Sequence, residues 1–202
     1  MNAAVVIPIR SFDAGKSRLG ARLDSAGRAD LLQAMAENVV AAAQGMPVAV
    51  VSNAPEVRSW ATTLGLTVLD DPGTLDLAAA AGLGWASAAG FGRVLVAHAD
   101  LPLATNLTPV ASDGLCPVVT AVPCHRDDGT PVLSLPTAAT GFVFAYGPGS
   151  FRRHAAAARS AGLAFRVRRD ERLGRDVDSP DDLVGLGVPI TGSGRLHALL
   201  NA

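Results

Sequence analysis

Short apolar runs typical of strands alternate along the chain with longer stretches of helical pattern. Ala3–Ile9 is apolar and rich in β-branched residues, which indicates a buried strand. A helix is expected next, capped by Asp24 or Ser25 and continuing to about Gln44 with its apolar residues on one face. This half of the chain also predicts strands at Val48–Ser52, Leu66–Leu69 and Gly92–His98, and helices at Pro55–Leu64 and Thr74–Ala89. The alternation predicts an α/β fold with a mainly parallel sheet.

The second half of the chain has a less regular pattern. Its apolar runs predict strands at Pro117–Val122, Val132–Leu135, Gly141–Tyr146 and Ala164–Arg168, and its helical stretches lie at Gly149–Ala161 and Pro180–Leu186. Ser179 is a candidate cap for the last helix, which has Pro in its first turn. The sequence contains no internal repeat and no linker rich in Pro, Gly or Ser. We therefore expect a single domain over residues 1–202.

The composition excludes several classes of protein. The chain has 202 residues, of which 49% are hydrophobic and 17% charged, enough to bury a core. The net charge of −1 argues against a general nucleic-acid surface. No apolar run reaches the ~20 residues that span a bilayer, and the first ten residues do not resemble a secretory signal. Two cysteines cannot build a disulfide framework or a zinc ribbon, so the expected location is cytoplasmic, without a membrane partner.

The loop after the first expected strand is basic. It contains Arg10, Lys16 and Arg18, and Lys16 is the single lysine among 17 basic residues. Gly15-Lys16-Ser17 is similar to part of a P-loop, but Arg10 stands where that motif requires its first glycine. Cations on a flexible loop suit a triphosphate, and a compact ammonium is not equivalent to a guanidinium at a tight phosphate site. The alternative is a solvated basic loop without a ligand.

Carboxylates follow two of the later apolar segments. Asp100 comes directly after the strand that ends near His98, and Asp176 and Asp178 precede the last expected helix. Because ligands of open α/β sheets bind beyond the carboxyl ends of the strands, these groups are candidates to hold Mg²⁺ with phosphate oxygens. Alternatively, Asp178 only caps the helix that follows. Two such acidic positions together with the basic loop favour a phosphate-and-metal site. His98 lies beside Asp100, but we expect it to be a packed side chain.

Five short motifs occur in an order that is specific as a set. They are Pro8-Ile9-Arg10 with Lys16-Ser17-Arg18-Leu19, Asp71-Pro72-Gly73 with Leu75, Asp100-Leu101-Pro102, Gly147-Pro148-Gly149-Ser150-Phe151, and Asp176-Val177-Asp178-Ser179-Pro180. With them, nearly the whole chain resembles the 2-phospho-L-lactate or phosphoenolpyruvate guanylyltransferases of coenzyme F420 biosynthesis. The resemblance implies a three-layer, Rossmann-like nucleotidyltransferase fold with a mainly parallel mixed sheet. Related nucleotidyltransferases usually open with a Gly-rich loop, where this chain has Ile9-Arg10-Ser11-Phe12.

The resemblance also implies roles for individual residues. Lys16, Arg18 and Arg10 would bind the triphosphate and the leaving pyrophosphate, with Lys16, Arg18 and Asp100 as the catalytic residues. Asp71, Pro72 and Gly73 would line the guanine pocket. Asp100, Asp176 and Asp178 would hold Mg²⁺, and Thr130, Gly147 and Ser150 would hold the phosphorylated acid.

The implied partners are GTP and a small phosphorylated carboxylic acid, and the implied state is a monomer or a homodimer. Sixteen arginines to one lysine indicate a GC-rich, actinobacterial source. In that group the family's acceptor is mostly phosphoenolpyruvate, so phosphoenolpyruvate is the expected acceptor. Two alternatives remain at this stage. The first is a nucleotidyltransferase of the molybdenum-cofactor or sugar-phosphate type, and the second is a nucleotide-binding module without catalysis.

Overall fold

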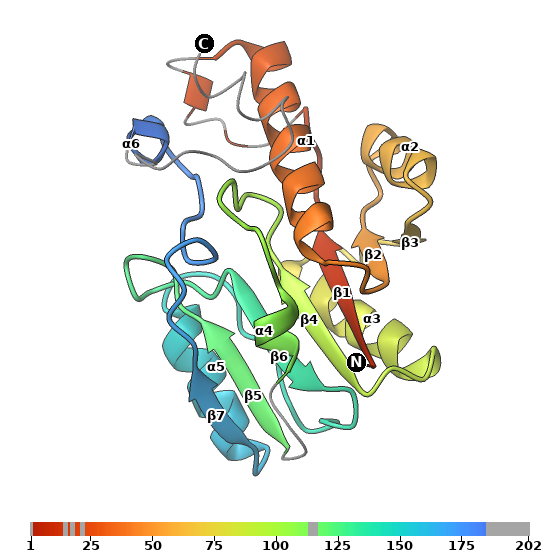
Figure 1. The fold of residues 1–202 in the computed structure, drawn as a ribbon, viewed down its shortest axis with the longest axis vertical. Helices are drawn as coiled ribbons and strands as arrows, with labels where there is room; N and C mark the ends of the chain where they lie inside the picture. Colours follow the sequence, from red (N-terminus) through yellow and green to blue (C-terminus); the bar gives the residue numbers. More distant parts are fainter. Residues whose placement is uncertain (1, 14–15, 17–18, 21–22, 113–116, 185–202) are drawn as a thin grey trace.

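The computed structural model describes residues 2–13, 16, 19–20, 23–112 and 117–184. Strands and helices alternate through most of this chain (Figure 1). The strands are β1 (Ala3–Pro8), β2 (Val48–Val51), β3 (Thr67–Leu69), β4 (Arg93–Ala97), β5 (Val118–Val122), β6 (Val132–Pro136) and β7 (Ala164–Val167). The helices are α1 (Ser25–Ala42), α2 (Pro55–Thr63), α3 (Leu75–Ala88), α4 (Thr108–Ala111), α5 (Ser150–Ser160) and α6 (Pro180–Val184).

The strands form one seven-stranded sheet in the order β3-β2-β1-β4-β6-β5-β7. Strands β1 to β4 are mutually parallel, with Val5 of β1 opposite Val48 of β2 and Leu95 of β4. β6 runs antiparallel to both of its neighbours, and β7 pairs with β5 in parallel. The predicted α/β fold with a mainly parallel mixed sheet is therefore confirmed.

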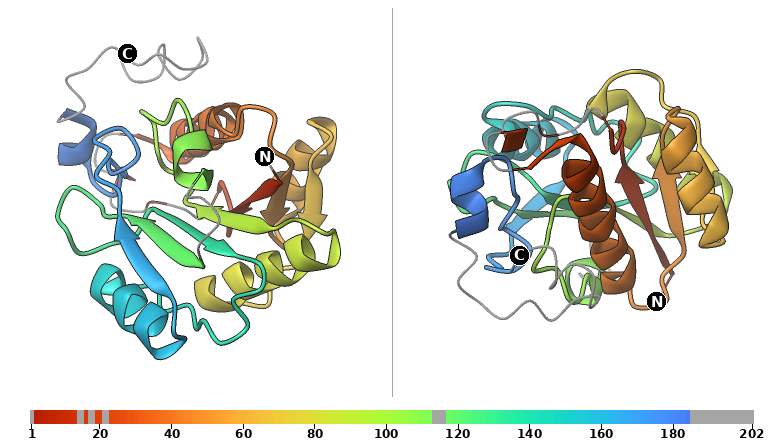
Figure 2. Two further views of the ribbon diagram at one scale, coloured as in Figure 1. Left: turned by 60° about the horizontal axis from the view of Figure 1, so that its bottom comes forward. Right: turned by 90° about the horizontal axis from the view of Figure 1, so that it is seen from above.

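Helices cover both faces of the sheet and make three layers (Figure 2). Successive residues of a strand point to opposite faces, so β1 contributes to two cores. Val5 and Ile7 pack in one hydrophobic cluster with α1, α2 and α4, while Ala4 and Val6 pack in another with α3 and α5. All four residues are fully buried, which explains why this strand is a continuous apolar run in the sequence.

Two local features set the helices in place. Asp24 caps α1, since its Oδ1 accepts a hydrogen bond of 2.7 Å from the Gly27 amide, as the sequence predicted. Gly82 lets α3 lie directly on the sheet, because a Cβ atom there would come within 2.4 Å of Val6 Cγ1.

The strand predicted at Gly141–Tyr146 is wrong. Phe142 and Phe144 are buried and Val143 is 70% exposed, so the side chains alternate as they do in a strand. The backbone, however, belongs to no ladder of the described sheet. After β6 the chain leaves the sheet, and these aromatic residues pack in the hydrophobic cluster that the sheet forms with α3 and α5. The burial pattern of a strand therefore arises here from an extended segment packed on a sheet face.

The remaining differences are small. The short helix α4 (Thr108–Ala111) has no counterpart among the expected helices, and the predicted end of α6 at Leu186 lies outside the described residues. None of the described helices has the length and apolar character needed to cross a membrane.

Candidate functional site

A cleft of about 350 Å³ lies at the carboxyl ends of β1 and β4. Its walls include Arg10 and Lys16 from the loop after β1, Asp100 from the loop after β4, and Asp176 and Asp178 from the loop before α6. These loops are far apart in the sequence and meet because parallel strands end at the same edge of the sheet. The cleft therefore combines cations and carboxylates at the place where α/β proteins bind ligands.

Lys16 joins the basic loop to the acidic ones. Its ammonium contacts Oδ2 of Asp100 and lies 2.5 Å from Oδ1 of Asp178. Burial disfavours the charge on Lys16, but the two carboxylates outweigh that penalty and raise the pKa of Lys16. Burial likewise works against the Asp100 anion, yet the Lys16 ammonium and the nearby His98 hold the pKa of Asp100 below its usual value. Both Lys16 and Asp100 are thus charged at neutral pH.

Two carboxylate oxygens in the cleft lack a hydrogen-bond donor. Asp100 Oδ1 and Asp176 Oδ1 are buried and have no hydrogen-bond partner. Burial, followed by repulsion from Asp100 and Asp178, raises the pKa of Asp176. A buried oxygen that accepts no hydrogen bond is typical of a site that an ion or a water molecule occupies. This part of the cleft therefore has an excess of acceptor oxygens that a cation would satisfy.

The donor set fits Mg²⁺ bound together with a phosphate. Within the described ranges, no group of three or more His, Cys, Asp or Glu side chains is arranged to hold a metal ion by itself. Mg²⁺ rarely uses an all-protein cage and is usually held by one or two carboxylates, water and substrate phosphates. Asp100 with Asp176 or Asp178 supplies that number of carboxylates.

A smaller cavity of about 220 Å³ adjoins the cleft and is lined by Arg10, Asp71 and Gly73 among others. Asn53 fixes the Asp71 loop by exchanging two hydrogen bonds with the Asp71 backbone, of 2.6 Å and 3.0 Å. The Gly73 amide then donates to Asp71 Oδ1 at 2.8 Å. Gly73 has φ of +106°, a conformation that favours glycine at this turn. Pro72 lies between these two residues in the same turn.

Polar side chains outside the cleft hold its loops. Glu56 Oε1 accepts hydrogen bonds from Ser11 Oγ at 2.7 Å and from the Phe12 amide at 3.2 Å, which anchors the loop after β1. Asn38, buried in α1, donates from Nδ2 to the carbonyls of Leu101, Pro102 and Ala104, which fixes the chain after Asp100. Asn38 interrupts the apolar face of α1, and this interruption was a signal available in the sequence.

Asp182 holds the segment that carries Asp178. Its Oδ2 accepts the amides of Asp178 at 3.0 Å and Ser179 at 2.8 Å, and also the Ser179 hydroxyl at 2.8 Å. Its Oδ1 lies 2.6 Å from Nη2 of Arg126, in the turn between β5 and β6. The acidic loop is thereby attached to the neighbouring hairpin, a link that no motif in the sequence indicates.

Thr130 and Ser150, two of the residues expected to hold the phosphorylated acid, lie together and are buried. Ser150 Oγ donates to Thr130 Oγ1 at 3.3 Å, and Thr130 Oγ1 is 3.1 Å from Nδ1 of His154. Gly147 begins the turn before α5 with φ of +96°, and its carbonyl accepts the Ser150 amide. Tyr146, next to Gly147, contacts His98 of the cleft with tilted rings, 5.5 Å apart between the ring centroids. These residues therefore adjoin the cleft on the side of His98.

The environment of His154 predicts that the folded protein loses stability at acidic pH. The Nε2 atom of His154 accepts the Ala145 amide at 3.1 Å, so a proton on Nε2 would break this bond. Burial and then the charge of Arg153 lower the pKa of His154 to about 4. The unfolded chain binds this proton below pH ~6.5 and the folded chain only near pH 4, so stability falls over that interval by up to about 3 kcal/mol.

Urea unfolding at pH 7 and pH 4.5 measures this effect. Between these pH values the free energy of unfolding should fall by about 2 kcal/mol more in the wild type than in His154→Gln, which has no imidazole at position 154. Equal losses in the two proteins would show that His154 does not carry the acid sensitivity.

The structure brings five of the candidate residues, Arg10, Lys16, Asp100, Asp176 and Asp178, to one cleft. Arg18 lies outside the described residues.

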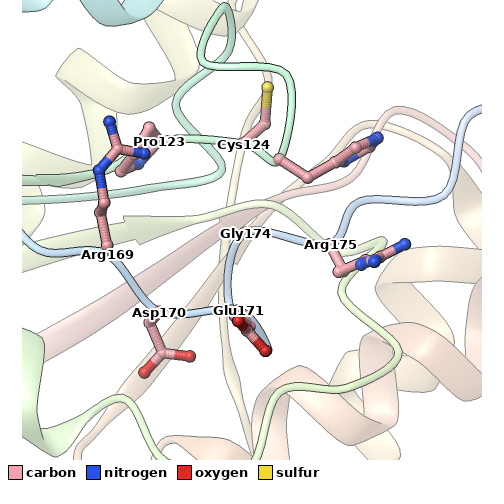
Figure 3. Close-up of a pocket in the computed structure, with 8 residues that line it drawn as sticks. Pro123, Cys124, Arg169, Asp170, Glu171, Gly174 and Arg175 are labelled. Carbon is pink, nitrogen blue, oxygen red and sulfur yellow. The ribbon is translucent and has the colours of Figure 1, made fainter. Parts of the chain in front are cut away.

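A further cavity of about 400 Å³ is lined by residues that the motifs did not include, among them Arg169, Asp170 and Glu171 on the segment after β7 (Figure 3). His125 of that cavity approaches Asp176 of the cleft, at 3.6 Å between Nδ1 and Oδ1. Cys124 is a buried free thiol, and Cys116 lies outside the described residues.

The fold is that of nucleotidyltransferases. A crystal structure from Desulfovibrio desulfuricans G20, assigned as a nucleotide-diphospho-sugar transferase, superposes with a TM-score of 0.79 at 15% identity. The match covers 99% of this chain and 94% of that one. This likeness establishes the architecture, while the activity depends on the residues of the site.

The chain belongs to the family described as "Guanylyl transferase CofC like", whose profile matches residues 3–197. A phosphoenolpyruvate guanylyltransferase of Rubrobacter xylanophilus is 39% identical over 196 residues, covering 92% of this chain and 94% of that protein. A 2-phospho-L-lactate guanylyltransferase of Methanothermobacter thermautotrophicus is 32% identical over 191 residues, covering 91% and 83%. The family resemblance seen in the motifs is thus confirmed.

Proposed function

We propose that the protein transfers GMP from GTP to phosphoenolpyruvate and releases pyrophosphate, as a step of coenzyme F420 biosynthesis. The observation that carries this proposal is the contact of Lys16 with both Asp100 and Asp178 at the carboxyl ends of the parallel strands. That arrangement provides a cation for phosphate charge beside carboxylates for a metal. It occurs in a chain of the guanylyl transferase family.

The proposed roles are those that the family resemblance implies, and the geometry of the described residues supports part of them. Arg10, Lys16 and Arg18 bind the triphosphate, and Asp71, Pro72 and Gly73 line the guanine pocket, which we assign to the 220 Å³ cavity. Thr130, Gly147 and Ser150 hold the phosphorylated acid. The Thr130 and Ser150 hydroxyls bond to each other and so fix the turn before α5, which is one way for them to support acid binding.

Asp100, Asp176 and Asp178 are the residues that would hold Mg²⁺. When bound, Mg²⁺ neutralises phosphate charge and orients the attacking and leaving oxygens. The buried, unpartnered Oδ1 atoms of Asp100 and Asp176 support this assignment.

In the proposed reaction, a phosphate oxygen of phosphoenolpyruvate forms a bond to the α-phosphorus of GTP. The bond between that phosphorus and the oxygen bridging to the β-phosphate breaks, and pyrophosphate leaves with the electron pair. No protein base is required, since the attacking phosphate is already ionised at neutral pH. The chain has to align the two substrates and stabilise charge, and Lys16 and Arg10 do so on the leaving pyrophosphate.

Phosphoenolpyruvate is the proposed acceptor because the Rubrobacter relative bears that name at 39% identity, against 32% for the phospholactate relative. The proposed compartment is the cytoplasm, since both substrates are highly charged and do not cross membranes unaided.

Pyrophosphate release tests the proposal. The purified protein is incubated with GTP, Mg²⁺ and, separately, phosphoenolpyruvate, 2-phospholactate or 3-phosphoglycerate. Added pyrophosphatase draws the reaction forward and converts the released pyrophosphate into inorganic phosphate, which is measured. Release is expected with phosphoenolpyruvate above the other two acids. Release with none of them would refute the function, and a preference for phospholactate would refute the acceptor.

Asp182→Ala is expected to weaken the use of Mg²⁺. The variant removes the acceptor of the Asp178 and Ser179 amides, so the loop that places Asp178 loosens. The Mg²⁺ concentration for half-maximal pyrophosphate release should rise about tenfold, equal to about 1.4 kcal/mol.

Asp181→Ala is the matched control, because Asp181 is exposed on the same helix. It removes one carboxylate from the same region and should leave the Mg²⁺ titration unchanged. Equal shifts in both variants would mean that net charge, and not the Asp182 hydrogen bonds, controls the metal.

A further inference from the structure

His98 is a polar side chain of the cleft to which the proposed roles give no task. It follows β4 directly, stands two residues before Asp100, and lines the cleft with Lys16 and Asp176. Its Nε2 atom is buried and has no hydrogen-bond partner. A buried nitrogen without a partner destabilises the free protein, so a partner supplied by a ligand is the natural explanation.

His98 also adjoins the residues assigned to the phosphorylated acid. Its ring lies at a tilted angle of 44° to that of Tyr146, the neighbour of Gly147, and its backbone amide donates to the Pro131 carbonyl at 2.8 Å, next to Thr130. Tyr146 is itself 4.7 Å from the ring of His154, which bonds Thr130. His98 therefore lies between Asp100 and the residues assigned to the phosphorylated acid.

The acceptor acid carries two anionic groups, a phosphate and a carboxylate, which require different binding groups. Its phosphate must lie at Lys16 and the metal carboxylates in order to attack. Its carboxylate takes no part in bond formation and needs a hydrogen-bond donor of its own, because the negative charges of Asp100 and Asp176 would otherwise repel it. An imidazole N–H is such a donor. A site with a buried donor strongly disfavours substrates that lack the matching acceptor, because the donor would then stay unpaired.

We propose that His98 is a specificity-determining residue that donates a hydrogen bond from Nε2 to the carboxylate of the acceptor. This inference rests on the proposed function, since it requires that the chain transfer a nucleotide to a phosphorylated acid. It makes His98 a contact of the acceptor and not of GTP.

Three substitutions separate this role from packing. His98→Gln places an amide near the position of Nε2, His98→Asn places one near Nδ1, and His98→Phe keeps a ring against Tyr146 without a donor. We expect kcat/KM for phosphoenolpyruvate to fall about thirtyfold in His98→Phe and His98→Asn, and His98→Gln to recover most of the loss. The dissociation constant of GTP, measured by calorimetry, should stay unchanged in all three.

Ethyl phosphate, which lacks the carboxylate, provides the decisive comparison. The wild type should prefer phosphoenolpyruvate over ethyl phosphate, and His98→Phe should lose most of that preference because only the reaction of the acid is impaired. An unchanged preference would overturn the proposal, as would equal activities of the Gln and Asn variants, a pair that differs only in reach. A wild type that transfers to no acid would instead refute the proposed function.

Discussion

Asp100→Asn is expected to lower kcat/KM for guanylyl transfer by at least about a thousandfold, equal to about 4 kcal/mol of transition-state stabilisation. Asp100 lies at the centre of the cleft, where one oxygen contacts the Lys16 ammonium and the other is buried without a partner. The amide keeps the shape of the side chain but removes the charge that pairs with Lys16. It also presents an N–H₂ group, which cannot bind a metal as a carboxylate does.

Asp127→Asn is the matched control for this prediction. Asp127 is an exposed carboxylate paired with Arg169 at 2.7 Å, outside the cleft, and asparagine tolerates its positive φ of 55°. The control should retain full activity. An Asp100→Asn variant within tenfold of the wild type would show that the metal and the Lys16 ion pair are not required, and the proposed site would be wrong.

Lys16→Met is expected to reduce turnover about a hundredfold, and Lys16→Arg more than tenfold. A methionine cannot stabilise charge on the leaving pyrophosphate. An arginine keeps the charge, but its planar fork does not replace a compact ammonium that contacts Asp100 and Asp178 together. Steady-state pyrophosphate release measures both effects, and an Arg variant with wild-type turnover would contradict the role of Lys16.

Metal binding without nucleotide gives the Lys16 variants a second readout. In the absence of GTP the Lys16 ammonium neutralises the carboxylates that a cation would bind. Lys16→Met should therefore bind Mn²⁺ more tightly than the wild type, measured by the paramagnetic signal of the free ion. Weaker binding would show that Lys16 supports the metal site and does not compete with the metal.

The sequence was sufficient to predict the central sheet. Residues 3–7 of β1 and 94–97 of β4 are buried on both faces of the sheet, so they are continuous apolar runs that no surface segment would contain. Gly141–Tyr146 was assigned wrongly because alternating burial and backbone pairing are separate properties. The pattern reports which side chains are buried and does not report whether a neighbouring strand receives the hydrogen bonds.

The grouping of the charged candidate residues in one cleft was predictable for a topological reason. Lys16, Asp100 and Asp178 each follow or precede a regular element at the same edge of the sheet, so knowing the strands places them together. The supporting residues were not predicted. Asn53 and Glu56 act through hydrogen bonds to backbone groups of loops distant in the sequence, and such contacts leave no periodic pattern in the sequence.

Isotope transfer tests the central claim most directly. The protein is incubated with Mg²⁺, phosphoenolpyruvate and GTP labelled with ³²P at either the α or the γ position, with Asp100→Asn in parallel. The account predicts that the α label moves to a product whose formation requires phosphoenolpyruvate, that the γ label leaves as pyrophosphate, and that Asp100→Asn does neither. An α label that stays in GTP, or that is released as GMP without any need for phosphoenolpyruvate, would contradict it.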